Sequence, residues 1–156
     1  MESSLRVGGA LRKSWRQDTL GGEGLLDDYA FYILGLLQFH PATRERGALD
    51  LAAQLADEAR SRVWDDSRKA FRLSPAGPEL PLRPLSFYDG ALPSGNSVMA
   101  WNLTVLHRLA DRADNSIRAT VFAAGATLAR APSNHCFALL ALLMLESPAQ
   151  EVVIAA

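Results

Sequence analysis

The sequence predicts an all-α protein in which about five helices are joined by short extended segments. Its 156 residues, 49% of them hydrophobic, are enough for one core. Segments that are apolar on every face alternate with segments that carry a single apolar stripe. The inner and outer helices of an α/α toroid give this alternation, because inner helices are covered on both sides and outer helices on one. A plain antiparallel bundle, which needs mostly one-sided stripes, is the alternative.

The first 23 residues are expected to be irregular, with loops and a short extended piece. Glycines interrupt them, and their apolar residues are too sparse for a long amphipathic helix. These glycines do not match the phosphate-binding pattern G-x-x-x-x-G-K-[ST]. We therefore separate an N-terminal segment, 1–23, from a helical domain, 24–146.

The first helix is predicted over Leu25 to Phe39 and should be buried all round, because apolar residues cover its whole circumference. Asp27 and Asp28 in its first turn favour the positive end of the helix dipole. Pro41 is expected to end it.

The second helix, Arg44 to Val63, has one apolar stripe and is predicted to be amphipathic. Residues 64–83 contain several prolines and read as a loop or small hairpin, in which 70–73 could form a strand.

A polar turn from Tyr88 to Ser97 opens into the third helix, which is apolar on nearly every face and ends near Arg112. Residues 116–130 form a further amphipathic segment. Pro132 to Asn134 then begin another fully apolar helix, Cys136 to Leu145, with Cys136 packed as a small apolar residue. An extended tail, 147–156, follows.

Four segments resemble a known family in the same order. They are L-R-K-S-W-R from Leu11 with L-D-D-Y-A-F from Leu26, L-R-P from Leu82, D-G-A-L-P-S-G-N-S from Asp89, and Q-E-V-V-I from Gln150. They are similar to segments of the large thioredoxin-domain proteins related to spermatogenesis-associated protein.

This resemblance implies a fold and a relation to longer proteins. Family members carry an N-terminal thioredoxin-like domain followed by a helical toroid similar to six-hairpin glycosidases and sugar epimerases. The chain matches only the later part of that toroid, so we expect a fragment that lacks the thioredoxin-like part and the N-terminal part of the toroid. A fragment of this kind should expose apolar edges.

The composition limits which kinds of partner and which cellular compartment we expect. A formal net charge of −1 and a pI near 6.3 argue against nucleic acid and anionic membranes as partners. The longest apolar run, 136–145, is shorter than the roughly 20 residues that span a bilayer. A single cysteine and no C-x-x-C fit a reducing compartment, so we expect a cytoplasmic protein. No cofactor is predicted, and the three histidines lack metal-ligand spacing.

Paired carboxylates suggest where chemistry could occur. Asp28 and Asp89 each lie at or before the start of a predicted inner helix, so in a toroid they could converge as the acid and base of sugar cleavage. Arg16 or Arg83 could bind an anionic substituent. The ligand-binding candidates are Trp15, Arg16, Asp27, Tyr29, Tyr88, Ser94, Asn96, Ser97 and Trp101.

The sequence is compatible with two functions. The first is an uncharacterised toroid domain that binds or processes a carbohydrate. The second is a non-catalytic helical scaffold, attached in longer relatives to a thioredoxin-like domain. First-turn aspartates more often cap helices, and tryptophans in apolar helices more often belong to a core, so the scaffold explains the same residues.

Overall fold

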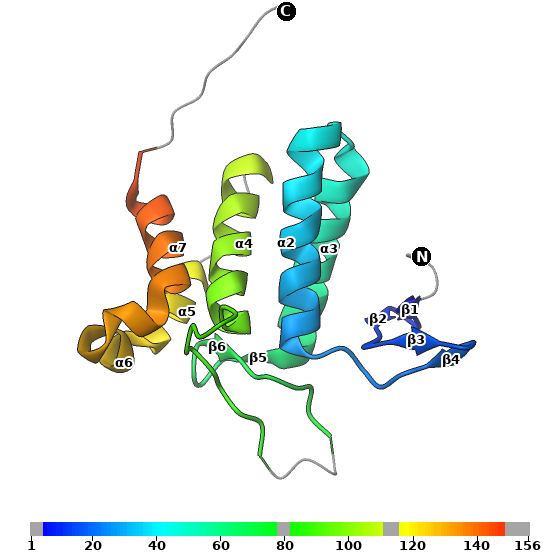
Figure 1. Ribbon diagram of the computed structural model, residues 1–156, viewed down its shortest axis with the longest axis horizontal. Coiled ribbons are helices and arrows are strands. Elements are labelled where there is room, and N and C mark those ends of the chain that lie inside the picture. Colours follow the sequence, from blue (N-terminus) through cyan, green and yellow to red (C-terminus); the bar gives the residue numbers. More distant parts are fainter. Residues whose placement is uncertain (1–4, 78–81, 111–115, 149–156) are drawn as a thin grey trace, which may run out of the picture.

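The computed structural model describes residues 5–77, 82–110 and 116–148 (Figure 1). The predicted end of the third helix near Arg112 and the segment from Gln150 lie outside these residues. The helices are α2 (Leu26–Thr43), α3 (Arg46–Val63), α4 (Gly95–Ala110), α5 (Ser116–Ala123), α6 (Gly125–Arg130), the 3-10 helix η1 (Pro132–His135) and α7 (Cys136–Glu146). The strands are β1 (Arg6–Val7), β2 (Ala10–Leu11), β3 (Trp15–Arg16), β4 (Thr19–Leu20), β5 (Trp64–Asp65) and β6 (Ala70–Phe71).

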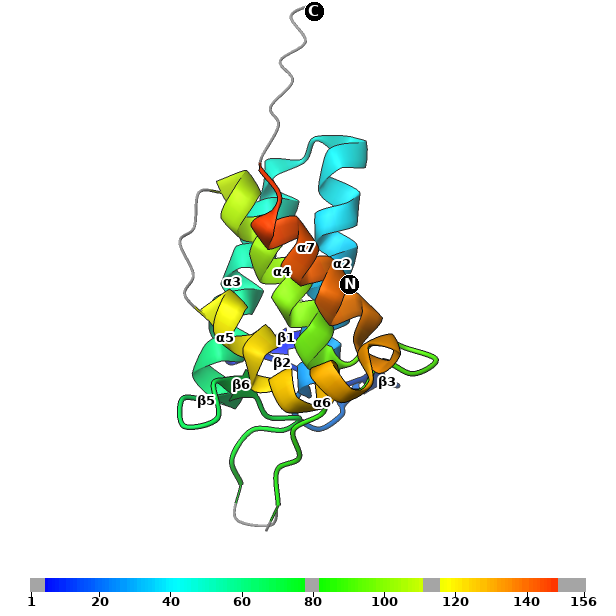
Figure 2. The ribbon, with the colours of Figure 1, turned by 90° about the vertical axis from the view of Figure 1, so that its left-hand side faces the viewer.

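Three parallel helices, α2, α4 and α7, start at the same end of the molecule (Figure 1). Helix α3 runs in the opposite direction, and α5 and α6 lead the chain back to this end (Figure 2). Helix α4 is central, since it packs against α2, α3, α5 and α7. The all-α prediction is confirmed at this level, whereas closure into a toroid stays a prediction.

Helix α2 is buried on a broad face rather than all round. Tyr29, Ile33 and Leu37 lie in the core, but Phe39 is exposed. The prediction that Pro41 ends the helix is wrong, because the helix continues to Thr43. Pro41 lies in the last turn, where it removes only one hydrogen bond, and Arg44 in the left-handed conformation then closes the helix through its N–H to the His40 carbonyl.

Helix α3 has the predicted amphipathic stripe, with Ala52, Leu55, Ala59 and Val63 in the core. The predicted hairpin in the following segment is also confirmed, because β5 pairs with β6 in antiparallel register. Phe71 of β6 is fully buried, and its ring meets Trp64 edge to face at 5.0 Å between centroids.

Helix α4 is buried over its first two turns on every side, as expected. Val98, Met99 and Leu106 belong to the main core. Its last three residues are exposed, so the all-round burial holds only for the half nearest the shared helix starts.

The last part of the chain differs from the prediction in three ways. The segment 116–130 forms two helices, because the backbone turns at Ala124, whose N–H donates to the Val121 carbonyl. Helix α7 is not buried all round: only Ala138 and Ala141 are buried, and Leu143 is 64% exposed. Cys136 is exposed at the start of α7 and donates to the Ser133 carbonyl.

The N-terminal residues form two small hairpins, β1–β2 and β3–β4, which are more ordered than the predicted loops. Buried Ala10 and Leu11 hold the first hairpin to the helices. An isolated antiparallel β-bridge between the backbones of Arg12 and Glu23 joins the two ends of the segment that carries the second hairpin.

A close approach between α2 and α4 provides a test of this packing. A Cβ atom on Gly95 would lie 2.8 Å from Leu26 Cγ and closer still to Asp27 Oδ1. We predict that Gly95→Ala lowers the free energy of unfolding by about 2 kcal/mol, measured by urea denaturation.

The matched control is Gly35→Ala, on the exposed side of α2 with no atom within 4 Å of the added Cβ. It should raise the free energy of unfolding by about 0.5 to 1 kcal/mol, because alanine favours a helix. Equal effects of the two substitutions would contradict the close contact.

Candidate functional site

The shared end of α2, α4 and α7 gathers most of the candidate residues, and Asp89 has a structural task there. Its Oδ2 accepts the N–H groups of Phe137 (2.8 Å) and Ala138 (3.3 Å) at the start of α7. Its Oδ1 accepts the Ser94 N–H at 2.9 Å. Both carboxylate oxygens are therefore occupied in joining the turn before α4 to the start of α7.

Ser94 and Ser97 cap α4. The Ser94 Oγ accepts the Ser97 N–H at 3.2 Å and lies 2.9 Å from the Ser97 hydroxyl. Both serines are buried, so this pair satisfies helix-start groups away from water.

Asn96 joins α4 to the preceding hairpin. It is 1% exposed, and its amide accepts the Phe71 N–H and donates to the Phe71 carbonyl, both at 2.9 Å. The same amide donates to the Ser86 carbonyl at 3.0 Å. The Asn96 side chain thus makes the hydrogen bonds to Phe71 of β6 that a neighbouring strand would otherwise make.

Asp27 and Asp28 have different environments although they are adjacent. Asp28 Oδ2 accepts the Leu25 N–H at 2.8 Å, which caps α2. Asp27 accepts the N–H of Gly95 at the start of α4. Partial burial of the Asp27 carboxylate, with the negative charge of Asp28 beside it, raises the Asp27 pKa, and the Gly95 hydrogen bond opposes this shift less strongly.

Both carboxylates line a hollow of about 400 Å³ at the start of α2. Two cationic residues of the N-terminal segment, Arg12 and Lys13, form part of its wall. The Arg12 Nε atom is buried without a hydrogen-bond partner among the described residues. The other lining residues are apolar or aromatic: Leu5, Leu11, Phe31, Tyr32 and Leu92.

The remaining candidates lie outside this hollow. Trp15 and Arg16 are exposed on β3, whereas Trp101 packs on Phe137 with ring centroids 5.7 Å apart. Tyr88 is 61% exposed and lines a separate hollow. Arg83 uses its backbone carbonyl to accept a hydrogen bond from Arg72. The structure therefore brings Asp27 and Asp28 together, but places Asp89 and Asn96 among backbone groups.

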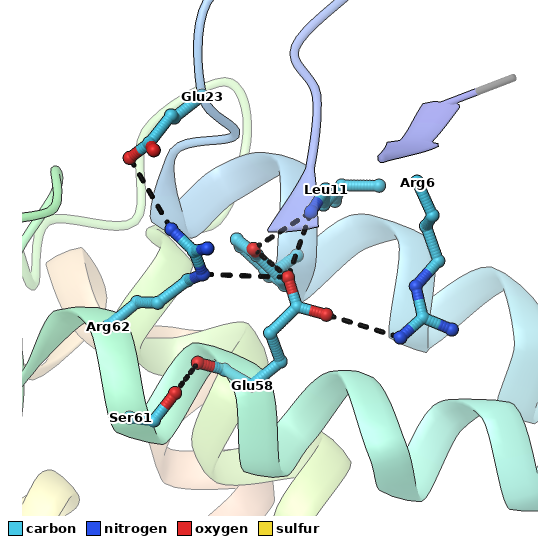
Figure 3. A network of polar contacts seen from close by, with 7 residues as sticks. Arg6, Leu11, Glu23, Glu58, Ser61 and Arg62 are labelled. Atoms are coloured by element: carbon cyan, nitrogen blue, oxygen red, sulfur yellow. Dashed lines mark hydrogen bonds and ion pairs between the residues drawn. The ribbon is translucent and has the colours of Figure 1, made fainter. Parts of the chain in front are cut away.

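Glu58 is an important residue that the sequence analysis missed (Figure 3). Its side chain is only 10% exposed, although it comes from the amphipathic helix α3. It accepts the Leu11 N–H at 2.8 Å and the hydroxyl proton of buried Tyr29. It also pairs with Arg6 at 3.3 Å and with Arg62 at 3.7 Å.

This network attaches the N-terminal segment to the helices. Four residues of the N-terminal segment line the hollow: Leu5, Leu11, Arg12 and Lys13. Glu58 does not line the hollow itself, but it holds this wall in place through its hydrogen bond to Leu11. The only sequence signal for Glu58 is its i, i+4 spacing to Arg62, which is common on exposed helix faces. Tyr29, predicted to bind a ligand, lies inside this network and is fully buried.

Within the described residues, no three His, Cys, Asp or Glu side chains gather closely enough to hold a metal ion. No helix in that part of the chain has both the length and the apolar character needed to cross a bilayer.

Comparison with known proteins relates this helical, carboxylate-bearing chain to spermatogenesis-associated protein 20. No family model matches the chain. It is 42% identical over 93 residues to spermatogenesis-associated protein 20 of Rattus norvegicus, which covers 58% of this chain and 12% of that protein. The Homo sapiens protein is 43% identical over 86 residues, or 54% of this chain and 11% of that protein. These matches support the family resemblance, over about an eighth of the relatives' length.

A substitution at Asn96 tests its structural assignment. Asn96→Ala leaves the buried Phe71 N–H and carbonyl without their side-chain partner and removes the hydrogen bond to the Ser86 carbonyl. We predict a loss of about 3 kcal/mol in the free energy of unfolding. Gln38→Ala, at an exposed position of α2, serves as the control and should change stability by less than about 0.5 kcal/mol. A stable Asn96→Ala protein would contradict the assignment.

The Glu58 network predicts a pH-dependent contribution to stability from Tyr29. Burial and the hydrogen bond to Glu58 raise the Tyr29 pKa. Because the folded state favours the neutral phenol, this contribution is complete below the unfolded pKa of about 10 and is lost as the pH rises further.

We therefore expect Tyr29→Phe to lower the free energy of unfolding by about 1 to 2 kcal/mol at pH 8. The difference from the natural protein should shrink above about pH 10. Tyr88→Phe removes an exposed hydroxyl and is the control, with stability unchanged at pH 8. A difference between Tyr29→Phe and the natural protein that stays constant up to pH 11 would contradict this network.

Proposed function

We propose that the hollow at the start of α2 binds a carbohydrate. The observation that carries this proposal is that Asp27 and Asp28 line one hollow of about 400 Å³ together with two aromatic residues, Phe31 and Tyr32. A volume of this order is usual for sites that bind small molecules.

The chemistry of the walls suits a sugar. Sugar hydroxyls are donors that need acceptors, and two carboxylates at neighbouring positions supply several oxygens. Aromatic rings pack on the apolar face of a sugar ring. Arg12 and Lys13 supply donors for ring and hydroxyl oxygens.

Asp27 and Asp28 have different roles in the proposed sugar processing. The raised pKa suits Asp27 to donate a proton, and Asp28 keeps one oxygen beyond its capping hydrogen bond. We assign this pair in place of Asp28 and Asp89, because both Asp89 oxygens already accept backbone N–H groups.

The architecture is consistent with part of an α/α toroid. Parallel α2, α4 and α7, with α3 and α5–α6 returning between them, repeat a helical hairpin along the chain (Figure 2). We propose that longer relatives continue this repeat, and that the sugar connection implied by six-hairpin enzymes applies to the hollow described here.

A helical scaffold is the second candidate, favoured by one observation. Phe122, Leu140 and Leu143 are 61%, 48% and 64% exposed, which leaves apolar surface on α5 and α7. Surfaces of this kind often contact other proteins or other parts of a longer chain.

A thermal-shift screen against neutral, amino and uronic sugars distinguishes these functions. We expect one class to raise the melting temperature of the natural chain, because a ligand that binds only the folded state stabilises it. Asp27→Asn and Asp28→Asn should lose this shift, whereas Asp50→Asn, at an exposed position of α3, should keep it. A cooperative melt that no sugar moves would favour the scaffold.

Keeping the partly buried Asp27 carboxylate charged lowers the stability of the folded state. Its raised pKa means that the folded state favours the protonated form, so stability falls as the pH rises through the Asp27 pKa. Asp27→Asn should therefore have a higher melting temperature than the natural chain at pH 7. The advantage should shrink as the pH falls and Asp27 becomes protonated. A lower melting temperature of Asp27→Asn at pH 7 would contradict the assignment.

A further inference from the structure

A second hollow, of about 460 Å³, lies at the start end of the helices, separate from Asp27 and Asp28. One wall is the extended segment 85–88, which leads to the turn before α4. The other wall comes from α6, η1 and the residue between them, with Thr127, Arg130 and Asn134. Figure 2 shows α6 at this end of the molecule.

His135 lines this hollow and has a defined protonation pattern. It is 4% exposed, and its Nδ1 lies 2.6 Å from the Phe87 carbonyl oxygen. A carbonyl oxygen can only accept a hydrogen bond, so Nδ1 carries the proton in the neutral imidazole. The Nε2 atom then holds a lone pair and requires a donor.

No described residue supplies that donor. Among the described residues, His135 makes its hydrogen bond through Nδ1. Nε2 is not one of the polar side-chain atoms that are both fully enclosed and without a partner. His135 lines the hollow, so its side chain borders any molecule held there. A ligand that offers an O–H or N–H group to Nε2 would complete its hydrogen bonding.

Arg130 sets the charge of this hollow. It is exposed and has no ion pair among the described residues, and none of the described residues that line the hollow is acidic. A guanidinium matches a carboxylate through two parallel hydrogen bonds. Arg130 therefore favours an anionic ligand group, and a carboxylate fits its two parallel hydrogen bonds.

The rest of the lining is mainly apolar. Leu85, Phe87, Tyr88 and Ala131 contribute to it, and Tyr88 offers an exposed ring. A planar, apolar body would bury its faces against these residues.

From these features we propose that this second hollow binds a hydroxylated aromatic carboxylate. Arg130 pairs with the carboxylate, the ring lies against Phe87 and Tyr88, and the hydroxyl donates to His135 Nε2. The proposal is independent of sugar binding at Asp27 and Asp28.

The test uses the three isomers of hydroxybenzoate with the full chain. Calorimetry measures affinity, and the ¹⁵N chemical shift of His135 Nε2 reports the contact. At least one isomer should bind saturably and move this shift. Benzoate lacks the donor, and the matching hydroxybenzamide lacks the charge, so each should bind about tenfold more weakly.

Arg130→Gln and Arg46→Gln form a matched pair, because both residues are exposed on helices and only Arg130 lines the hollow. Arg130→Gln should weaken binding of the best isomer about tenfold, and Arg46→Gln should leave it unchanged. His135 stays intact, so its buried contact to Phe87 is preserved in every variant. The proposal is overturned if no isomer moves the His135 Nε2 shift at millimolar concentration, or if Arg130→Gln binds as tightly as the natural chain.

Discussion

The structure depends on the need to satisfy the backbone N–H groups of three parallel helices that start at one end. The first N–H groups of a helix have no partner within it. Here Asp27 accepts from Gly95 at the start of α4, Ser94 accepts from Ser97, and Asp89 accepts from two N–H groups of α7. Asp27 and Asp89 lie on other elements than the helices that they cap. Their hydrogen bonds therefore also fix the positions of α4 and α7.

This constraint leaves the carboxylates at the shared end in different environments. Asp89 is fully used, because it joins the turn before α4 to α7. Asp27 is held against α4, yet partial burial and the charge of Asp28 raise its pKa. The Glu58 network then closes one side of the hollow by attaching Leu11 to the helices. The proposed sugar site lies where the helix caps, the acidic pair and the N-terminal hairpin meet.

Periodicity predicted what depends on local pattern. It identified α2, the stripe of α3, the β5–β6 hairpin and the polar turn before α4. It could not show that Asp89 caps α7 rather than α4, because that contact spans 48 residues. It also missed Glu58, whose burial depends on a hairpin packed against α3. The exposure of α7 was missed because an apolar sequence does not reveal whether a neighbour covers it.

A carboxyl-carbon NMR titration of Asp27, without ligand and with the sugar class that stabilises the chain, tests whether Asp27 and Asp28 form a ligand site. We expect Asp27 to titrate above the ordinary aspartate value of about 3.9 and the saturating sugar to change its titration. An Asp27 that titrates at or below that value, with no change when sugar is added, would contradict the claim that this pair forms a ligand site.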